Sequence, residues 1–119
     1  MEIICIFVID ILKSIEKIEK YILRLSYEEF IKDSKTKDAV VRNLEIIGEA
    51  AKVISKDVQK RYEDIQWAQI VGMRNRLIHG YFVVDYKIVW HIVTNELPDL
   101  KRKMEKILKE STNYQKNRD

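Results

Sequence analysis

The sequence predicts an all-α protein that folds as an antiparallel, up-and-down helical bundle. Only 3 glycines and 1 proline occur among the 119 residues, of which 46% are hydrophobic and 34% are charged, as is typical of amphipathic helices. In several long segments the apolar residues are spaced alternately four and three positions apart, which indicates helices with one buried face. Residues 81–84 are the most strand-like, but this run is too short and isolated to predict a paired strand.

Two long helices joined by a short one are expected in the first half of the chain. The first carries an apolar seam formed by Ile4, Val8, Ile11, Ile15, Ile18, Ile22 and Leu25. Ser26 and Glu29 have the spacing of a capping box, which would begin the short helix. The second long helix is expected over about residues 35–55. Its small residues Gly48 and Ala51 would allow a neighbouring helix to approach closely.

Shorter helices and one further long helix are expected in the second half of the chain. A helical piece at residues 56–62 would be followed by a helix over residues 66–79, with Gly80 closing its last turn. Asp85 could cap the final long helix. Pro98 lacks an N–H donor and should therefore kink or break that helix just before it.

The chain is expected to form one domain of residues 1–110, with residues 111–119 as a frayed tail because they show no helical periodicity. The apolar residues 3–9 are far fewer than the ~20 of a membrane span, so no membrane role is expected. The single cysteine excludes an intramolecular disulfide, and 2 histidines are too few for a Cys/His metal cluster. This composition fits a reducing cytoplasm. The net charge of +3 does not by itself indicate nucleic-acid binding.

A polar cluster near the end of the expected 66–79 helix is not explained by exposed helix faces. Arg74 falls within the apolar stripe, where a charged side chain is costly unless it is paired or opens onto a cleft. Asn75 and His79 are four residues apart, so Asn75 could orient the imidazole from the same helix face. The flexible backbone of Gly80 would let the chain turn and bring the Tyr81 hydroxyl back toward them.

These residue types suit the cleavage of a phosphodiester bond. A histidine can take the proton of a ribose 2′-hydroxyl or give one to the leaving 5′-oxygen, and an arginine can hold two non-bridging oxygens. Neither role needs a metal. Because His79 cannot easily be both base and acid, a two-fold dimer with two Arg74–His79 pairs across one cleft would complete the site. Without family knowledge, an arginine and a histidine at a helix end are more often a structural cap and an ion pair. The other histidine, His91, is interpreted as structural or as a surface residue.

The block Arg74-x4-His79-x-Tyr81 resembles the signature of the HepT branch of the HEPN superfamily. Residues 38–52 also resemble the central helix of that family. Further matches to its usual pattern are Trp67, the run 70–75, the pair Tyr81-Phe82 and the pair Leu97-Pro98. The resemblance extends from about residue 10 to residue 108, which is most of the chain.

The resemblance implies a HEPN-like bundle of four to five helices and a homodimer whose Arg74 and His79 motifs line a shared cleft. It implies a toxin that is a metal-independent endoribonuclease without a cofactor, acting on RNA and not on DNA. It also implies an antitoxin of the minimal nucleotidyltransferase (MNT) type, which transfers AMP from ATP to Tyr81. A bulky anion there would block the phosphate site and offset its positive charge.

Two other parts of the sequence allow alternative interpretations. Arg42, Glu45 and Glu49 share one face of the central helix, which helix geometry alone explains as an exposed face or an ion pair. The alternative is a supporting shell for the cleft or a contact with the antitoxin. The apolar residues 3–9 depart from the expected charged start and would form a partner-binding patch if they face solvent.

Two other functions compete with the toxin. The chain could be a non-catalytic helical partner, or substrate-presenting subunit, of a nucleotidyltransferase, with Tyr81 merely the modified group. It could also be a general RNA-binding helical module, which the small net charge of +3 disfavours.

Overall fold

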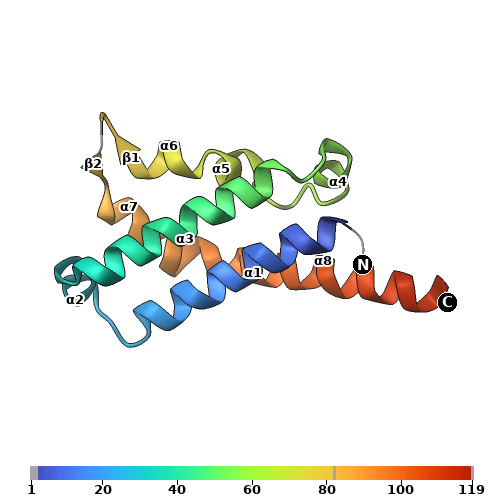
Figure 1. Cartoon of the computed structure of the whole chain (residues 1–119), viewed down its shortest axis with the longest axis horizontal. Helices are drawn as coiled ribbons and strands as arrows, with labels where there is room; N and C mark the ends of the chain where they lie inside the picture. Colours follow the sequence, from blue (N-terminus) through green and yellow to red (C-terminus); the bar gives the residue numbers. More distant parts are fainter. Residues whose placement is uncertain (1–2, 82, 119) are drawn as a thin grey trace.

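The computed structural model describes residues 3–81 and 83–118 and confirms the all-α fold (Figure 1). The helices are α1 (Ile3–Ile22), α2 (Tyr27–Lys32), α3 (Ser34–Lys52), α4 (Lys56–Arg61), α5 (Trp67–Val71), α6 (Met73–Leu77), α7 (Tyr86–His91) and α8 (Leu97–Arg118). Two short strands, β1 (Ile78–His79) and β2 (Val83–Val84), follow α6, and a π-helix, η1 (Ile92–Glu96), joins α7 to α8. No helix within this described part is long and apolar enough to span a bilayer.

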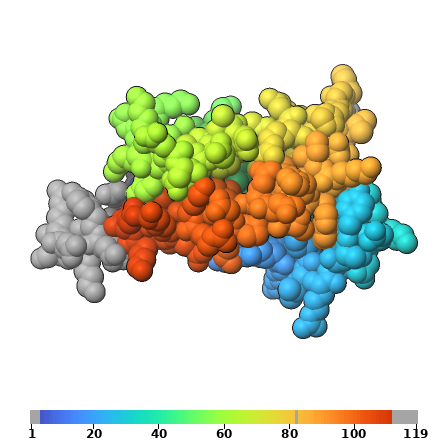
Figure 2. All heavy atoms as spheres, turned by 180° about the vertical axis from the view of Figure 1, so that it is seen from behind, coloured from blue at the N-terminus to red at the C-terminus, as the bar shows by residue number. Residues whose placement is uncertain are grey.

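The long helices α1, α3 and α8 form the body of the molecule. In Figure 1, α1 and α3 lie side by side on the face nearest the viewer, with α5 and α6 along the other side of α3. Figure 2 shows α8, in orange and red, across the opposite face. The β1–β2 hairpin lies at one end of the molecule, next to α6 and α7, so His79 and Tyr81 are at an end of the bundle and not at its centre.

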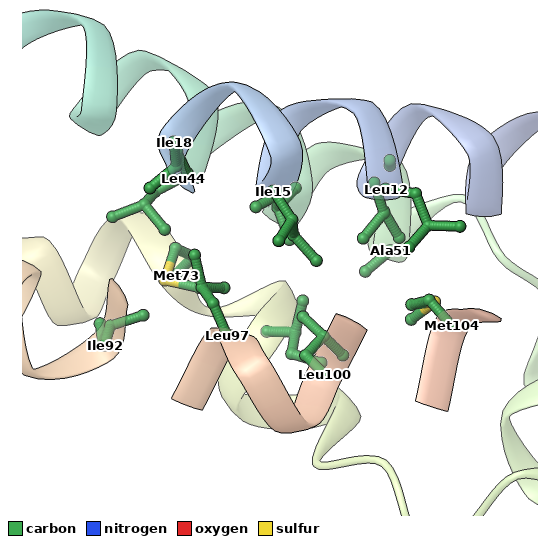
Figure 3. Packing of buried hydrophobic residues seen from close by; sticks show 14 of the residues in the cluster. Leu12, Ile15, Ile18, Leu44, Ala51, Met73, Ile92, Leu97, Leu100 and Met104 are labelled. Carbon is green, nitrogen blue, oxygen red and sulfur yellow. The ribbon is translucent and has the colours of Figure 1, made fainter. Parts of the chain in front are cut away.

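The core lies where the apolar seams of the three long helices meet. Figure 3 shows Leu12, Ile15 and Ile18 of α1 facing Leu44 and Ala51 of α3 and, across the core, Leu97, Leu100 and Met104 of α8. Of the expected first seam, Val8, Ile11, Ile15 and Ile18 are fully buried. Burial of such side chains contributes roughly 1.5–3 kcal/mol each and is the main source of stability.

Side-chain caps begin several helices at the expected places. Glu29 N–H donates to Ser26 Oγ at 3.1 Å and Ser26 N–H donates to Glu29 Oε1 at 3.0 Å, which confirms the capping box. Asp33 caps α3. Asp85 caps α7, as predicted, because its Oδ1 accepts the N–H groups of Lys87 and Ile88.

Gly48 brings α5 and α6 close to α3. A Cβ atom added at Gly48 would lie 3.0 Å from the carbonyl oxygen of Ile70 and 3.1 Å from the Cβ of Met73. Real Cβ atoms are rarely this close to other atoms, so a side chain here would move the neighbouring helices apart. The expected close helix approach is therefore confirmed at Gly48, and it fixes where α6 lies.

The helix expected over residues 66–79 is present as two short helices, and the prediction is wrong at Gly72 and at residues 78–79. The helix is interrupted at Gly72, and α6 ends at Leu77. The chain then forms a hairpin in which Ile78 pairs with Val84 and His79 pairs with Val83. Gly80 does adopt the left-handed conformation (φ 64°), but it does so in the hairpin loop. The prediction that residues 81–84 form no paired strand is therefore wrong for Val83 and Val84. They pair with the residues just before Gly80.

Pro98 does not break the last helix. The N–H of Leu97 donates to the carbonyl of Ile92, five residues earlier, so the expected kink is replaced by the wide turn of η1. Pro98 then lies in the first turn of α8, where the backbone tolerates proline. The helix continues to Arg118 and includes most of the segment expected to fray. The division into residues 1–110 and a tail stays a prediction.

Candidate active site

Arg74 lies on the exposed side of α6, and the expectation that it belongs to the buried stripe is wrong. The buried residues of α5 and α6 follow at positions 67, 70, 73 and 77, so Met73 and not Arg74 takes the core-facing position. In α6 the buried residues are Met73 and Leu77, so Arg74 and Asn75 point to solvent. An exposed guanidinium has no burial cost to offset and is available to an anionic ligand.

Arg74 lines a groove of about 450 Å³ that runs along α3 between α1 and the α5–α6 segment. Arg42, Glu45 and Glu49 line the same groove. The three polar residues that share a face of α3 are therefore brought to Arg74. Two guanidinium groups and three carboxylates line this groove, the third carboxylate being that of Asp10, so the groove is not uniformly positive.

His79 lies in β1 and not in the last turn of a helix. Its side chain is 57% exposed, and its Nε2 lies 3.5 Å from Oδ2 of Asp85. The N–H of Asp85 also donates to the carbonyl of Leu77 at 2.8 Å, which fixes Asp85 beside the end of α6. Because α6 ends before His79, the helical geometry that would have placed Asn75 over the imidazole is absent. The carboxylate of Asp85 is the group that can orient this histidine.

Tyr81 lies in the loop of the hairpin, directly after Gly80. It is 87% exposed, more than any other large hydrophobic residue in the described part of the molecule. Its neighbour Phe82, part of the family resemblance, lies outside the described residues. The left-handed Gly80 therefore reverses the chain between His79 and Tyr81 and presents the tyrosine at the tip of the hairpin.

A second groove, of about 500 Å³, contains His79 and several residues that the sequence did not single out as a site. Its lining residues are Arg76, His79, Lys87, Ile88, His91 and Glu96. Arg76 holds Glu96 through two hydrogen bonds, of 3.0 and 2.6 Å, which tie α6 to η1. In a single chain, Arg74 and His79 thus line separate grooves.

His91 is a surface residue, as one of the two interpretations from the sequence proposed, with a side chain 63% exposed. Its Nδ1 lies 3.3 Å from Nδ2 of Asn95. Its helical position between two apolar residues gave no signal of a shared groove with His79. That proximity depends on the hairpin and on η1, neither of which was predicted.

No group of three or more His, Cys, Asp or Glu side chains suited to a metal ion occurs in the part of the chain that the structure describes. The single cysteine, Cys5, is buried in α1. The charged and titratable side chains that line the two grooves are arginine, lysine, histidine and carboxylate groups.

Comparison with known proteins identifies the family. The model of the family "Ribonuclease HepT-like" matches residues 11–107. "Putative RNase MJ1216" from Methanocaldococcus jannaschii is 45% identical over 104 residues, which cover 87% of this chain and 86% of that protein. "Probable ribonuclease HepT" from Thermococcus cleftensis is 44% identical over 100 residues, which cover 84% and 91%. "Putative RNase TTE0752" from Caldanaerobacter subterraneus is 40% identical over 98 residues, which cover 82% and 88%.

No solved structure matches the chain significantly. The family and relatives confirm the class of protein that the Arg74-x4-His79-x-Tyr81 motif indicated, an all-α ribonuclease of the HepT type. The chain belongs to the ribonuclease HepT-like family.

Proposed function

We propose that this protein is the toxin of a toxin–antitoxin system and cleaves RNA internally without a metal ion. The observation that carries the proposal is the exposed motif of a HepT-like chain, in which His79 lies 3.5 Å from the carboxylate of Asp85. A carboxylate–imidazole pair at an accessible position is suited to proton transfer. We place this activity in the cytoplasm, where RNA is encountered.

The proposed reaction is attack of a ribose 2′-oxygen on the adjacent phosphorus. His79 exchanges a proton with the 2′-hydroxyl or with the leaving 5′-oxygen, and Arg74 offsets the charge that develops on the non-bridging oxygens. The bond from phosphorus to the 5′-oxygen breaks, which leaves a 2′,3′-cyclic phosphate and a 5′-hydroxyl. We assign the orienting role at His79 to Asp85. Asn75, exposed beside Arg74 on α6, stays in the proposed site as a hydrogen-bonding contact to RNA or to a partner.

A homodimer is part of this proposal. Arg74 and His79 of one chain line separate grooves, so a second chain placed across them would supply the missing group of each pair. The groove of Arg74 borders an apolar surface suited to a contact between chains. Val53 and Ile6 are 57% and 50% exposed, and Phe7 lines the groove. Ile6 and Phe7 of the apolar N-terminal segment would then be covered by the second chain.

Inhibition by an antitoxin forms the second part of the proposal. The 87% exposure of Tyr81 makes its hydroxyl accessible to a nucleotidyltransferase of the MNT type, which would transfer AMP to it. Tyr81 follows His79 by two residues, in the loop of the same hairpin. A phosphate group there would repel the RNA backbone and compete for the cationic groups. The residues Arg42, Glu45 and Glu49 are proposed as a support for Arg74 or as a contact with the antitoxin.

The test is RNA cleavage by the purified protein in excess EDTA. Wild type should cleave, whereas Arg74→Ala and His79→Ala should each lose at least about 100-fold in rate. Arg102→Ala, which removes an exposed arginine of α8 that lines neither groove, should cleave like wild type. Full activity in both site variants, or activity that EDTA abolishes, would refute the assignment.

One observation favours a second function. Tyr81 is highly exposed, while Arg74 and His79 of the same chain do not share a groove. This arrangement fits a non-catalytic partner that only presents Tyr81 to a nucleotidyltransferase. Expression without the neighbouring antitoxin gene separates the two functions. A toxin should stop growth and His79→Ala should restore it, whereas a presenting subunit should be harmless in both forms.

A further inference from the structure

The groove that contains His79 has a second cationic side, formed by α7. Lys87 and His91 lie four residues apart on this helix and therefore on the same face. Both line the groove together with His79 from β1. Neither residue belongs to the Arg74-x4-His79-x-Tyr81 motif.

The imidazole of His91 lies beside the side-chain amide of Asn95, one helical turn further along the chain. The hydroxyl of Thr94 donates to the carbonyl of Trp90 at 2.7 Å, so its oxygen can accept from Nδ2 of Asn95 at 3.1 Å. The same Nδ2 donates to the carbonyl of His91 at 3.2 Å. Both contacts require a donor at this position, which fixes the orientation of the Asn95 amide. The two hydrogens of Nδ2 are directed to these two acceptors, and Nδ1 of His91 lies 3.3 Å from the same nitrogen.

Nε2 of His91 remains available to a ligand in the groove, and it can donate a hydrogen bond when it carries the ring proton. Its nearest acidic atom is Oε2 of Glu96 at 3.8 Å, which is too long for a hydrogen bond. Glu96 is instead held by the guanidinium of Arg76 through two hydrogen bonds, so this pair is electrically balanced. The carboxylate of Asp85 lies beside His79.

Lys87 supplies the uncompensated positive charge of the groove. It is exposed, and it forms no ion pair among the residues that the structure describes. A flexible ammonium group and an imidazole N–H on one helix face are complementary to a phosphate oxygen.

The geometry points to a phosphate-binding subsite formed by Lys87 and His91, which holds a phosphate of single-stranded RNA next to the phosphate that is cleaved at His79. This inference rests on the proposed ribonuclease function and adds to it the residues that would hold the flanking part of the substrate. Lys87 would contribute through charge, whereas His91 would contribute through one hydrogen bond. The two contributions can be separated by their dependence on salt.

The experiment measures binding of a 2′-O-methyl RNA of mixed sequence and about 20 nucleotides by fluorescence anisotropy. Methylation blocks the 2′-oxygen, so this RNA cannot be cleaved while it is bound. At about pH 8, where an ordinary imidazole is neutral, Lys87→Gln should raise Kd and reduce the slope of log Kd against log salt by about 0.7. His91→Ala should raise Kd roughly 3- to 10-fold without changing the slope. His91→Gln restores an N–H donor and should recover part of the affinity.

Lys106→Gln is the matched control, because Lys106 is an exposed lysine of α8 that does not line the groove. It should bind RNA like wild type. The inference is overturned if Lys87→Gln and His91→Ala bind like wild type, or if Lys106→Gln loses as much affinity as Lys87→Gln. Cleavage of unmodified RNA by wild type, measured in parallel, distinguishes the two failures. Cleavage with unchanged binding in both variants would reject the subsite and retain the ribonuclease, whereas no cleavage would reject the proposed function itself.

Discussion

The apolar seams of α1, α3 and α8 are buried along the bundle, whereas α6, the β1–β2 hairpin and α7 expose most of their polar side chains. The first region consists of helices of 19 to 22 residues. The second consists of helices of 5 and 6 residues and strands of 2 residues. Stability and the proposed chemistry therefore depend on different residues. Substitutions in one region should affect one property and leave the other nearly unchanged.

The largest effect on stability is expected from Leu44→Ala in α3. Leu44 is fully buried between the long helices, and its truncation should lower the free energy of unfolding by about 2–5 kcal/mol. His79→Ala should change it by less than about 0.5 kcal/mol, because the side chain is largely exposed. Urea denaturation followed by circular dichroism measures both changes. The rate of RNA cleavage by the folded proteins should show the opposite order, with the larger loss in His79→Ala.

A loss of several kcal/mol in His79→Ala would contradict this separation. It would mean that the hairpin is part of the cooperative core. The separation would also be contradicted if folded Leu44→Ala protein cleaved RNA as poorly as His79→Ala.

Gly48→Ala should have an intermediate effect, because Gly48 is where the two regions meet. The added Cβ would lie 3.0 Å from the carbonyl oxygen of Ile70. The resulting overpacking should cost about 1–3 kcal/mol, more than the ~1 kcal/mol that alanine gains over glycine in a helix. Displacement of α6 should also slow cleavage, because Arg74 moves with it. A thermal melt and a cleavage assay on one preparation measure both, and a stabilised variant would show that α3 and α6 are less tightly packed than the structure describes.

A smaller effect is expected at the Arg76–Glu96 ion pair, which connects α6 to η1. Its side chains are 27% and 32% exposed, so a double-mutant cycle with Arg76→Met and Glu96→Gln should give a coupling energy of about 0.5–1 kcal/mol. The Arg102–Asp99 pair, whose side chains are 70% and 51% exposed, is the matched control and should give a smaller coupling. Equal couplings in the two pairs would show that the first does not fix the position of α6.

The smallest effect concerns the N-cap of α3. The hydroxyl and the backbone N–H of Thr36 donate to the carboxylate of Asp33 and lower the pKa of that group. A carboxyl with a lowered native pKa contributes stability above its unfolded pKa of about 3.9, and this stability is lost as the pH falls through the native value. Asp33→Ala should therefore lower Tm slightly at pH 7, and the difference from wild type should shrink in acid. Thr36→Ser keeps both donors and should behave like wild type, whereas a difference that persists at the lowest pH would exclude the charged cap.

The core could be predicted from the sequence because it depends on local periodicity. Each of Ile15, Leu44 and Met104 belongs to a seam that repeats every three or four residues, and all three are fully buried. Side-chain caps are similarly local. The capping box of Ser26 and the cap at Asp85 need only neighbouring residues, and both are confirmed.

The geometry of the site could not be predicted in the same way. Helical periodicity continues past Gly72 in the sequence, so the interruption there and the exposure of Arg74 were missed. The pairing of His79 with Val83 is decided by tertiary packing, because two-residue strands have no stable pattern of their own. The Asp85 carboxylate beside His79 and the shared groove with His91 follow from that hairpin. The motif itself was identified through its resemblance to a family and not through its spacing alone.

The most direct test of the central claim is the chemical identity of the RNA ends that wild type produces in EDTA. Mass spectrometry of the fragments of a defined oligonucleotide distinguishes the two possible nucleophiles. Attack by the 2′-oxygen, with His79 transferring protons, predicts 2′,3′-cyclic phosphate and 5′-hydroxyl ends that disappear in His79→Ala. Ends with a 3′-hydroxyl and a 5′-phosphate would show that water is the nucleophile and would contradict the proposed roles of Arg74 and His79.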